Sequence, residues 1–401
     1  MSTSPERCLG GLIKDINEDI SPHDFEFDSK DETDFKTFSE KKFLSLDSIY
    51  SFNSSTSFFS PFSEDNKFSL PNKFSIINYN KSSILSAFNN QRSTIILQKS
   101  LMEISKETID NIIKEMSGTY SEIIRNKNGN YFCSDLFKVC DQNQRIIILK
   151  EICNSISDDC VDEYGTHPIQ TLIELSKCEE EYKFILSSFK DNNKILNVSL
   201  NHNGSFVIQK IIVNIPERYR MEFNLNFIKY LIILSMDMYG VCTVKKFINY
   251  TKNELLIKQI LNIILSNFVN ISENKYGNYL IQFILEYWWN KIEGTFLKKL
   301  CISKFHILAS NRFSSYICDL FIKLSNYEEK TILMSSLIKD KTITLLKNNN
   351  NGNIIMNKLI NSLKNKKVGN KTKINHIPLS LNNIRSFFNT YDKEKNDIKN
   401  K

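Results

Sequence analysis

The chain has 401 residues, of which 41% are hydrophobic and 24% charged, and its formal net charge at pH 7 is +7. That length allows two or three average domains, or one long array of repeats. The nine cysteines are an odd number and contain no C-x-x-C pair, which argues against zinc modules and a disulfide scaffold. No apolar run is long enough to span a bilayer, and we find no secretory signal. We therefore expect a soluble protein in a reducing, intracellular compartment.

The first part of the chain differs in charge from the rest. Residues 1–80 carry 8 Lys or Arg against 14 Asp or Glu, whereas the remaining residues carry 44 against 31. The first part is also rich in Ser, Asn and isolated Phe without periodicity, so we predict that residues 1–83 form a disordered acidic leader. Its Phe residues are either docking points for a partner or an accident of composition. The basic remainder favours a polyanionic partner.

From about residue 84, apolar positions recur at helical spacing and long strand-like alternation is absent. Six glycines share a register in similar segments: Gly129, Gly165, Gly204, Gly240, Gly277 and Gly352. Two further segments, at 91–101 and 312–322, fit this register without the glycine. The residues that follow the glycine position are spaced by 36, 36, 39, 36, 37, 37 and 38 residues. Eight units at a nearly constant period indicate a repeat protein.

This periodicity predicts an all-α fold, a right-handed α-solenoid superhelix of eight helical repeats. Each unit is too small to bury its own apolar face, so the units stack and share one core. We predict that the repeats occupy residues 84–365 and that residues 366–401 form a degenerate C-terminal cap and a charged tail. Each repeat is expected to contain one amphipathic helix before the glycine and a second helix after it. The glycine and the following Asn, Ser or Thr are expected to cap this second helix, which would line the concave face.

Three positions in each second helix differ from the surrounding core: the first, second and fifth residues after the glycine position. The first and fifth are four residues apart and therefore share a helix face. These pairs are Thr94/Gln98, Asn130/Ser134, Thr166/Gln170, Ser205/Gln209, Val241/Lys245, Asn278/Gln282, Ser315/Asp319 and Asn353/Asn357. The second position holds Ile95, Tyr131, His167, Phe206, Cys242, Tyr279, Tyr316 and Ile354, of which five carry a flat ring.

Such triplets suit unstacked bases, because a ring can lie between neighbouring bases while a polar pair bonds to one base edge. Simpler explanations exist for single columns: helix capping for the first position, core packing for the second. Neither predicts Gln at the fifth position in four repeats, so the columns together favour base recognition. Lysines just after the fifth position either approach phosphates or are solvated; they are Lys99, Lys210, Lys246 and Lys358.

At this point the residues resemble a known family. The segments KYGNYLIQ at 275–282 and NGSFVIQ at 203–209 are similar to the repeat signature of Pumilio-type PUF proteins. The segment RFSSYICD at 312–319 resembles the seventh repeat of that family, in which a small residue replaces the glycine. The resemblance covers about residues 84–365. It implies that the repeats bind RNA antiparallel, that the eighth repeat meets the 5′ base, and that repeats eight to six prefer U-G-U.

The triplets match the family's base patterns to different degrees. Asn278 and Gln282, with Tyr279 for stacking, match the uracil pattern, and Asn353 with Asn357 matches it in part. Ser315 with Asp319 resembles the Ser/Glu guanine pattern, with a carboxylate one methylene shorter. Ser205 with Gln209 resembles an adenine pair, and Thr166/Gln170 and Thr94/Gln98 are looser variants of it. Val241 with Lys245 and the serine at 134 depart from the patterns, so we expect little base preference there. The contacts implied for stacking are Tyr131, His167, Phe206, Cys242, Tyr279 and Tyr316.

Signals for catalysis are lacking in the sequence. It contains no P-loop, G-x-G-x-x-G, G-x-S-x-G or H-E-x-x-H motif. The acidic pair Asp158 and Asp159 is interpreted as a solvated turn between repeats. We therefore expect a protein that is not an enzyme and that needs no metal or cofactor.

The resemblance implies a monomeric, cytoplasmic mRNA-binding regulator. It would bind single-stranded RNA in 3′ untranslated regions, recruit repression or deadenylation factors, and not associate with membranes. One alternative is a nucleolar PUF-like factor in ribosome assembly. Another is an armadillo- or HEAT-like scaffold that binds peptides, in which case the fifth-position glutamines would have no shared purpose.

Overall fold

The computed structural model describes residues 79–364, and every regular element in that range is a helix. Most of the predicted leader and the predicted cap and tail at 366–401 lie outside the described residues. The first described helix begins at Lys81, three residues before the predicted start of the repeats. Within 79–364, no helix combines the length and apolarity needed to cross a bilayer. In the same range, no group of His, Cys, Asp and Glu is arranged to hold a metal ion.

Eight repeats follow one another, and most contain three helices rather than the two predicted. The second helices are α5 (Gln91–Ser100), α8 (Gly129–Val139), α11 (Thr166–Leu175), α14 (His202–Asn214), α17 (Gly240–Tyr250), α20 (Gly277–Trp288), α22 (Ser315–Leu324) and α25 (Asn350–Lys364). The first helices are α4 (Lys81–Ala87), α6 (Lys106–Met116), α9 (Gln142–Ile152), α12 (Glu179–Ser187), α15 (Met221–Lys229), α18 (Glu254–Ser266), α21 (Ile292–Ser310) and α23 (Tyr327–Lys339). A 3₁₀ turn, η1 (Glu217–Tyr219), precedes α15.

The additional element is a short helix between the other two. These short helices are α7 (Tyr120–Ile124), α10 (Ile156–Asp159), α13 (Asn192–Leu200), α16 (Leu231–Ser235), α19 (Phe268–Glu273) and α24 (Ile343–Lys347). In repeat 6 the apolar run that predicted one helix is divided at Asn267, whose backbone leaves the helical conformation. In repeat 7 the division does not occur, and α21 runs unbroken for 19 residues.

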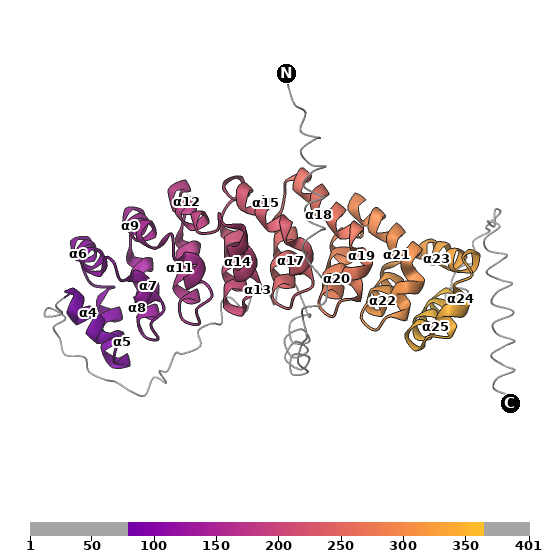
Figure 1. Cartoon of the computed structure of the whole chain (residues 1–401), viewed down its shortest axis with the longest axis horizontal. Coiled ribbons are helices and arrows are strands. Elements are labelled where there is room, and N and C mark those ends of the chain that lie inside the picture. Colours follow the sequence, from indigo (N-terminus) through magenta and orange to yellow (C-terminus); the bar gives the residue numbers. More distant parts are fainter. Residues whose placement is uncertain (1–78, 365–401) are drawn as a thin grey trace, which may run out of the picture. The chain divides into compact units, whose positions relative to one another are not determined.

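The helices stack in the order of the chain. Each second helix contacts the next one, from α5 and α8 through to α22 and α25. Figure 1 shows the first helices in one row and the second helices in another. We call the row of second helices the second-helix layer. This arrangement confirms the prediction of an all-α solenoid built from eight repeats.

The core lies between the rows and follows the predicted periodicity. In α20, the third, fourth, seventh and eighth residues after Gly277 are fully buried, namely Leu280, Ile281, Ile284 and Leu285. The same four positions of α8 are also fully buried. Residues at this spacing form one stripe on a helix, so each second helix turns one apolar face toward the core and leaves its opposite face for polar positions.

The predicted N-caps are wrong, because another residue caps the second helices. Three residues before each glycine position stands an Asn or Asp whose side chain accepts hydrogen bonds from backbone amides of the following turn. In repeat 6, Asn274 Oδ1 accepts from Tyr276 and Gly277 at 2.8 and 2.9 Å. The column contains Asn90, Asn126, Asp162, Asn201, Asp237, Asn274, Asn311 and Asn349. Capping is therefore complete without the first residue of the triplet.

The repeat glycine is needed because the second helix begins against the backbone of the short helix. A Cβ at Gly240 would lie 2.6 Å from the carbonyl oxygen of Leu234, six residues earlier. Repeat 7 accommodates a serine at this position in another way. Ser314 Oγ donates a hydrogen bond of 2.8 Å to the carbonyl oxygen of Leu308, also six residues earlier. The predicted equivalence of Ser314 with the glycines therefore has a structural reason.

Charged side chains join neighbouring repeats, and one of them corrects the sequence interpretation. Asp158 is exposed as expected, but Asp159 is fully buried and is not part of a solvated turn. Arg125 of repeat 2 donates to Asp159 Oδ1 at 2.7 Å. Arg145 donates in the same way to the buried Glu181 of the next repeat at 2.8 Å. These pairs satisfy charges that would otherwise be buried without a partner.

Candidate functional site

The predicted triplets lie along the second-helix layer, one set in each repeat. The second-position side chains are exposed or half-buried in all eight repeats. Tyr131 and Tyr316 are each 59% exposed, and Ile354 is 56% exposed. His167 is also exposed, whereas Ile95, Phe206, Cys242 and Tyr279 are half-buried. Large apolar groups at one repeated position are thus accessible to a ligand, which core packing alone does not explain.

The first-position side chains are much less accessible. Those of repeats 1 to 6 are at most 3% exposed: Thr94, Asn130, Thr166, Ser205, Val241 and Asn278. The first-position side chains of repeats 7 and 8 are more accessible: Ser315 is half-buried and Asn353 is exposed.

Hydrogen bonds to the capping turn hold the first-position side chains. Asn278 Nδ2 donates to the carbonyl oxygens of Asn274 and Lys275 at 3.0 and 2.9 Å. Asn130 repeats this arrangement with Asn126 and Lys127. The hydroxyl groups of Thr94, Ser205 and Ser315 donate to carbonyl oxygens in the same way. These donors are therefore used within the repeat, whereas Thr166 donates to the carbonyl oxygen of Asn203 in the next repeat at 3.2 Å.

The structure joins the first and fifth residues directly in three repeats. Gln282 Nε2 donates to Asn278 Oδ1 at 3.0 Å, and Gln170 Nε2 donates to Thr166 Oγ1 at 3.0 Å. In repeat 8, Asn357 Nδ2 donates to Asn353 Oδ1 at 3.2 Å. Gln282 Nε2 also donates to the backbone oxygen of Asn278 at 3.4 Å. The amide oxygens of Gln170 and Gln282 take no part in these bonds, so these two pairs can offer an acceptor to a ligand.

The remaining fifth positions have other surroundings. Gln98 donates to Asp135 of repeat 2 at 2.6 Å, and Ser134 donates to the backbone oxygen of Asn130 at 3.0 Å. Gln209 is half-buried on α14.

Repeat 5 differs from the others in the character of its pair. Val241 is buried and has no polar side-chain atom. The ammonium of Lys245 lies 5.7 Å from the ring centroid of Tyr279 in the next repeat, and desolvation lowers the pKa of this lysine. This pair therefore has a cation, and no side-chain acceptor, where other repeats have amides or hydroxyls.

Repeat 7 contains the only carboxylate among the sixteen first and fifth positions. Asp319 Oδ2 accepts from Lys323 on the same helix at 2.7 Å, and its Oδ1 accepts from Lys358 of repeat 8 at 2.6 Å. Partial burial opposes the ionisation of Asp319, but the two lysines outweigh it and hold the pKa of this carboxyl below its ordinary value. Asp319 is thus an anionic acceptor at neutral pH.

Two of the lysines for which the sequence left phosphate contact and solvation open bind acidic side chains of the preceding repeat. Lys358 contacts Asp319, and Lys210 pairs with Glu174. Sequence reasoning missed these contacts because each joins residues 36 or 39 positions apart. The repeat period itself could have indicated them, since it places equivalent helix positions side by side.

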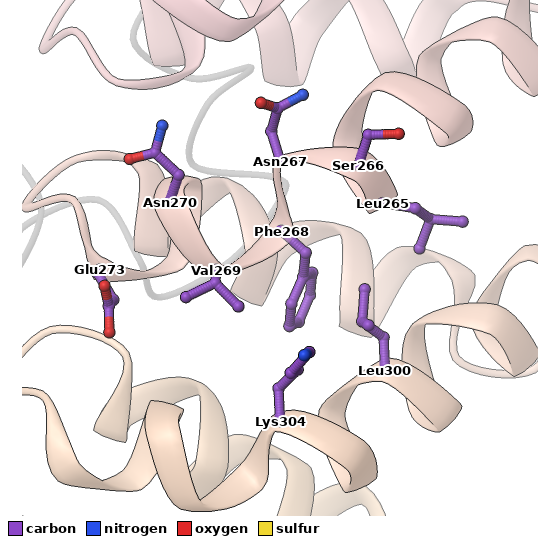
Figure 2. A pocket seen from close by; sticks show the side chains of 9 residues that line it. All are labelled: Leu265, Ser266, Asn267, Phe268, Val269, Asn270, Glu273, Leu300 and Lys304. Atoms are coloured by element: carbon purple, nitrogen blue, oxygen red, sulfur yellow. The ribbon is translucent and has the colours of Figure 1, made fainter. Parts of the chain in front are cut away.

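A separate pocket lies where repeats 6 and 7 meet, between the junction of α18 with α19 and the middle of α21. Figure 2 shows Phe268 pointing from the α18–α19 junction toward Leu300 and Lys304 of α21. No residue of the triplets lines this pocket. The candidate site is therefore the extended row of triplets rather than a closed cavity.

Fold and site together define a helical-repeat solenoid that presents one set of side chains per repeat, a class that binds extended ligands along its length. Comparison with known proteins shows which such solenoids this chain resembles. The model of the Pumilio-family RNA binding repeat matches residues 120–153, 194–222 and 267–288. Each match includes a short helix, or most of one, and the second helix after it. These segments of the chain therefore resemble Pumilio-family PUF repeats.

Curated relatives and solved structures show the same resemblance. Pumilio homolog 12 of Arabidopsis thaliana is 26% identical over 258 residues, which cover 62% of this chain and 42% of the relative. A Pumilio domain-containing protein of Schizosaccharomyces pombe is 23% identical over 67% of this chain and 39% of its own length. The chain thus matches about two fifths of these relatives.

Two solved structures show the same fold. The Puf4 RNA binding domain, bound to the HO endonuclease RNA 3′ UTR recognition sequence, has a TM-score of 0.63 at 20% identity. That match covers 74% of this chain and 90% of the Puf4 chain. The RNA-binding domain of yeast Puf5p bound to AAT2 RNA has a TM-score of 0.62 at 20% identity, over 72% of this chain and 85% of that one.

Proposed function

We propose that this protein binds single-stranded RNA and reads its sequence with one triplet per base. The observation that carries the proposal is the row of accessible second-position side chains, each beside a first and fifth residue on one face of successive second helices. Bases stack on flat side chains, and their Watson–Crick edges bond to polar pairs. The RNA-bound Puf4 and Puf5p structures support the same ligand class.

The preferred element is proposed to begin 5′-U-G-U, with the eighth repeat at the 5′ base. The amide oxygen of Gln282 suits the N3–H of uracil, and its amide nitrogen can donate to a uracil carbonyl oxygen in place of its bond of 3.4 Å to the backbone oxygen of Asn278. Asp319 is an anionic acceptor, which suits the two N–H groups on the edge of guanine. At repeat 5, the cation of Lys245 and the apolar Val241 give no complementary pair, so base choice there is relaxed. A protein with this specificity would act on mRNA 3′ untranslated regions.

The biological role follows from the ligand and remains part of the proposal. The protein would act in the cytoplasm as a monomeric regulator of translation or mRNA stability, and its effect would come through recruited repression or deadenylation factors. Its role would be binding rather than catalysis.

The test is a filter-binding titration of the full chain with a short RNA containing U-G-U, a scrambled RNA of equal composition, and the DNA version of the first. The variants Tyr279→Ala and Tyr316→Ala remove rings from the second-helix layer. Tyr327→Ala is the control, because it removes an exposed tyrosine from the first helix α23. Loss of one base–ring contact costs about 1–3 kcal/mol, so each site variant should weaken binding by roughly 5- to 150-fold.

The control variant should bind the U-G-U RNA like the unmodified protein. Equal binding of U-G-U and scrambled RNA would remove sequence-specific reading. Equal weakening by all three tyrosine variants would place the RNA somewhere other than the second-helix layer.

A further inference from the structure

The carboxylate of repeat 7 is shared with the next repeat. Lys358 extends from α25 to Asp319 on α22, and its Nζ lies 2.6 Å from Asp319 Oδ1. The lysine side chain is 50% exposed and the carboxylate 16% exposed, so the ammonium is the more accessible partner. Lys358 follows directly after Asn357, the fifth residue of the repeat 8 triplet. A fixed positive charge therefore lies between the edge-reading residues of two adjacent repeats.

We infer that Lys358 takes part in reading the base at repeat 7 by donating a hydrogen bond to O6 of guanine. This inference rests on the proposed function and adds a second specificity residue to the same site. Guanine presents on its Watson–Crick edge one acceptor, O6, beside two donor groups, N1–H and N2–H₂. The pair of Lys358 and Asp319 presents the complementary order, an ammonium donor beside a carboxylate with two acceptor oxygens.

The existing ion pair leaves capacity for both contacts. A carboxylate has about four lone-pair sites, so Asp319 can retain its two lysines and still accept from N1–H and N2–H₂. An ammonium has three N–H donors, and the bond to Asp319 occupies one of them. No proton transfer is needed, because Asp319 is already ionised at neutral pH.

The other bases fit this pair less well. Uracil has a single N–H between two carbonyl oxygens, so one carboxylate oxygen would face an acceptor. Adenine places an amino group beside a bare ring nitrogen, so it offers one donor group to the carboxylate and no carbonyl oxygen to the ammonium. Cytosine also offers a single donor group. Since unpaired polar groups at a desolvated edge carry a large penalty, the pair selects guanine.

Lys323 provides a matched control. It also bonds to Asp319, at 2.7 Å, but from the same helix and through the other oxygen. Lys323→Met and Lys358→Met remove the same charge and one partner of the same carboxylate. General electrostatic attraction to RNA therefore changes alike in the two variants, whereas only Lys358 has been assigned to O6.

The experiment measures binding of the 401-residue chain and both variants to three U-G-U oligomers, with guanine, 6-thioguanine or inosine at the second base. Sulfur is a weak acceptor, so 6-thioguanine weakens the contact to O6 and keeps both donor groups. Inosine keeps O6 and loses the N2 amino group. The unmodified protein and Lys323→Met should bind 6-thioguanine about tenfold more weakly than guanine. Lys358→Met should show a difference of less than about threefold.

Inosine should weaken binding in all three proteins, because one of the two contacts to Asp319, that from the N2 amino group, is lost in each. Lys358→Arg, which keeps a donor, should retain sensitivity to 6-thioguanine. The inference is overturned if Lys358→Met discriminates guanine from 6-thioguanine as the unmodified protein does, or if it weakens binding to all three RNAs by the same factor, as loss of a phosphate contact would. If the unmodified protein does not prefer U-G-U to scrambled RNA, the proposed function fails instead.

Discussion

Exchange of the repeat 7 pair for that of repeat 6 should change the second base from guanine to uracil. The double substitution Ser315→Asn with Asp319→Gln copies the pair Asn278 and Gln282 to the equivalent positions one repeat later. The backbone can hold the new residues, because Ser315 already donates to the carbonyl oxygen of Arg312 at 2.8 Å. In repeat 6 the equivalent carbonyl oxygen, that of Lys275, accepts from Asn278.

The magnitude follows from the contacts that are exchanged. A good bidentate contact to a base is worth about 1–3 kcal/mol of discrimination, which corresponds to roughly 5- to 150-fold in affinity. The unmodified protein should therefore prefer U-G-U to U-U-U within that range, and the double variant should reverse the preference. Its stability should change little, since the lysines that lose Asp319 are both at least half exposed and can be solvated.

Competition binding with the two oligomers, monitored by fluorescence anisotropy at fixed salt, measures this change. Salt is held constant because phosphate contacts make every RNA affinity depend on it. Circular dichroism would confirm that the variant remains folded. A folded variant that still prefers guanine would show that the register of the triplets is wrong, since the exchanged residues would then not meet that base.

Two further predictions concern the scaffold. Burial raises the pKa of the capping residue Asp237, although backbone amides oppose this effect. Ionisation of this carboxyl is therefore harder in the folded protein than in the unfolded chain, so the stability falls as the pH rises above the pKa of the unfolded carboxyl. Asp237→Asn keeps the cap and removes that cost, so the amount by which its urea midpoint exceeds that of the unmodified protein should grow from pH 4 to 7. A difference that does not grow with pH would contradict this reasoning. Asp162→Asn is the control for the effect of introducing an amide. Glu181→Ala leaves the buried Arg145 without its carboxylate and should lower the free energy of unfolding by about 3–5 kcal/mol. Glu180→Ala, which removes an exposed ion pair, should cost less than about 1 kcal/mol, and similar costs for both would mean that burial of the pair is unimportant.

The repeat architecture could be predicted from the sequence because a local steric constraint requires each repeat glycine. The constraint recurs in every repeat that has the glycine, so the regular spacing of these glycines is visible in the sequence alone. Even the exception at Ser314 stayed in register, since its hydroxyl bonds to the carbonyl oxygen that the glycine would approach. The division of the upstream helix at Asn267 left no comparable signal, because the run of apolar residues continues across it.

The contacts between repeats could not be predicted in the same way. In the sequence, Asp159 looks like one member of an exposed acidic pair. Only the stacking of the repeats shows that Arg125 lies beside it. The assignment of caps was wrong for a different reason. Asn and Asp residues three positions before the glycine were visible in all eight repeats, but the column after the glycine has the residue types of a cap too.

The position of the true cap has a consequence for how specificity can vary. If Asn278 capped α20, replacing the first residue of a triplet would cost about 1 kcal/mol in helix stability and base choice would be tied to folding. Because Asn274 binds the first amides of the helix instead, repeat 5 can hold Val241 at the first position and still begin α17 at the same point, where Asp237 accepts from the amides of Tyr239 and Gly240. The scaffold is thus fixed by the glycine and the residue three before it, and the triplet after the glycine can vary without loss of the cap.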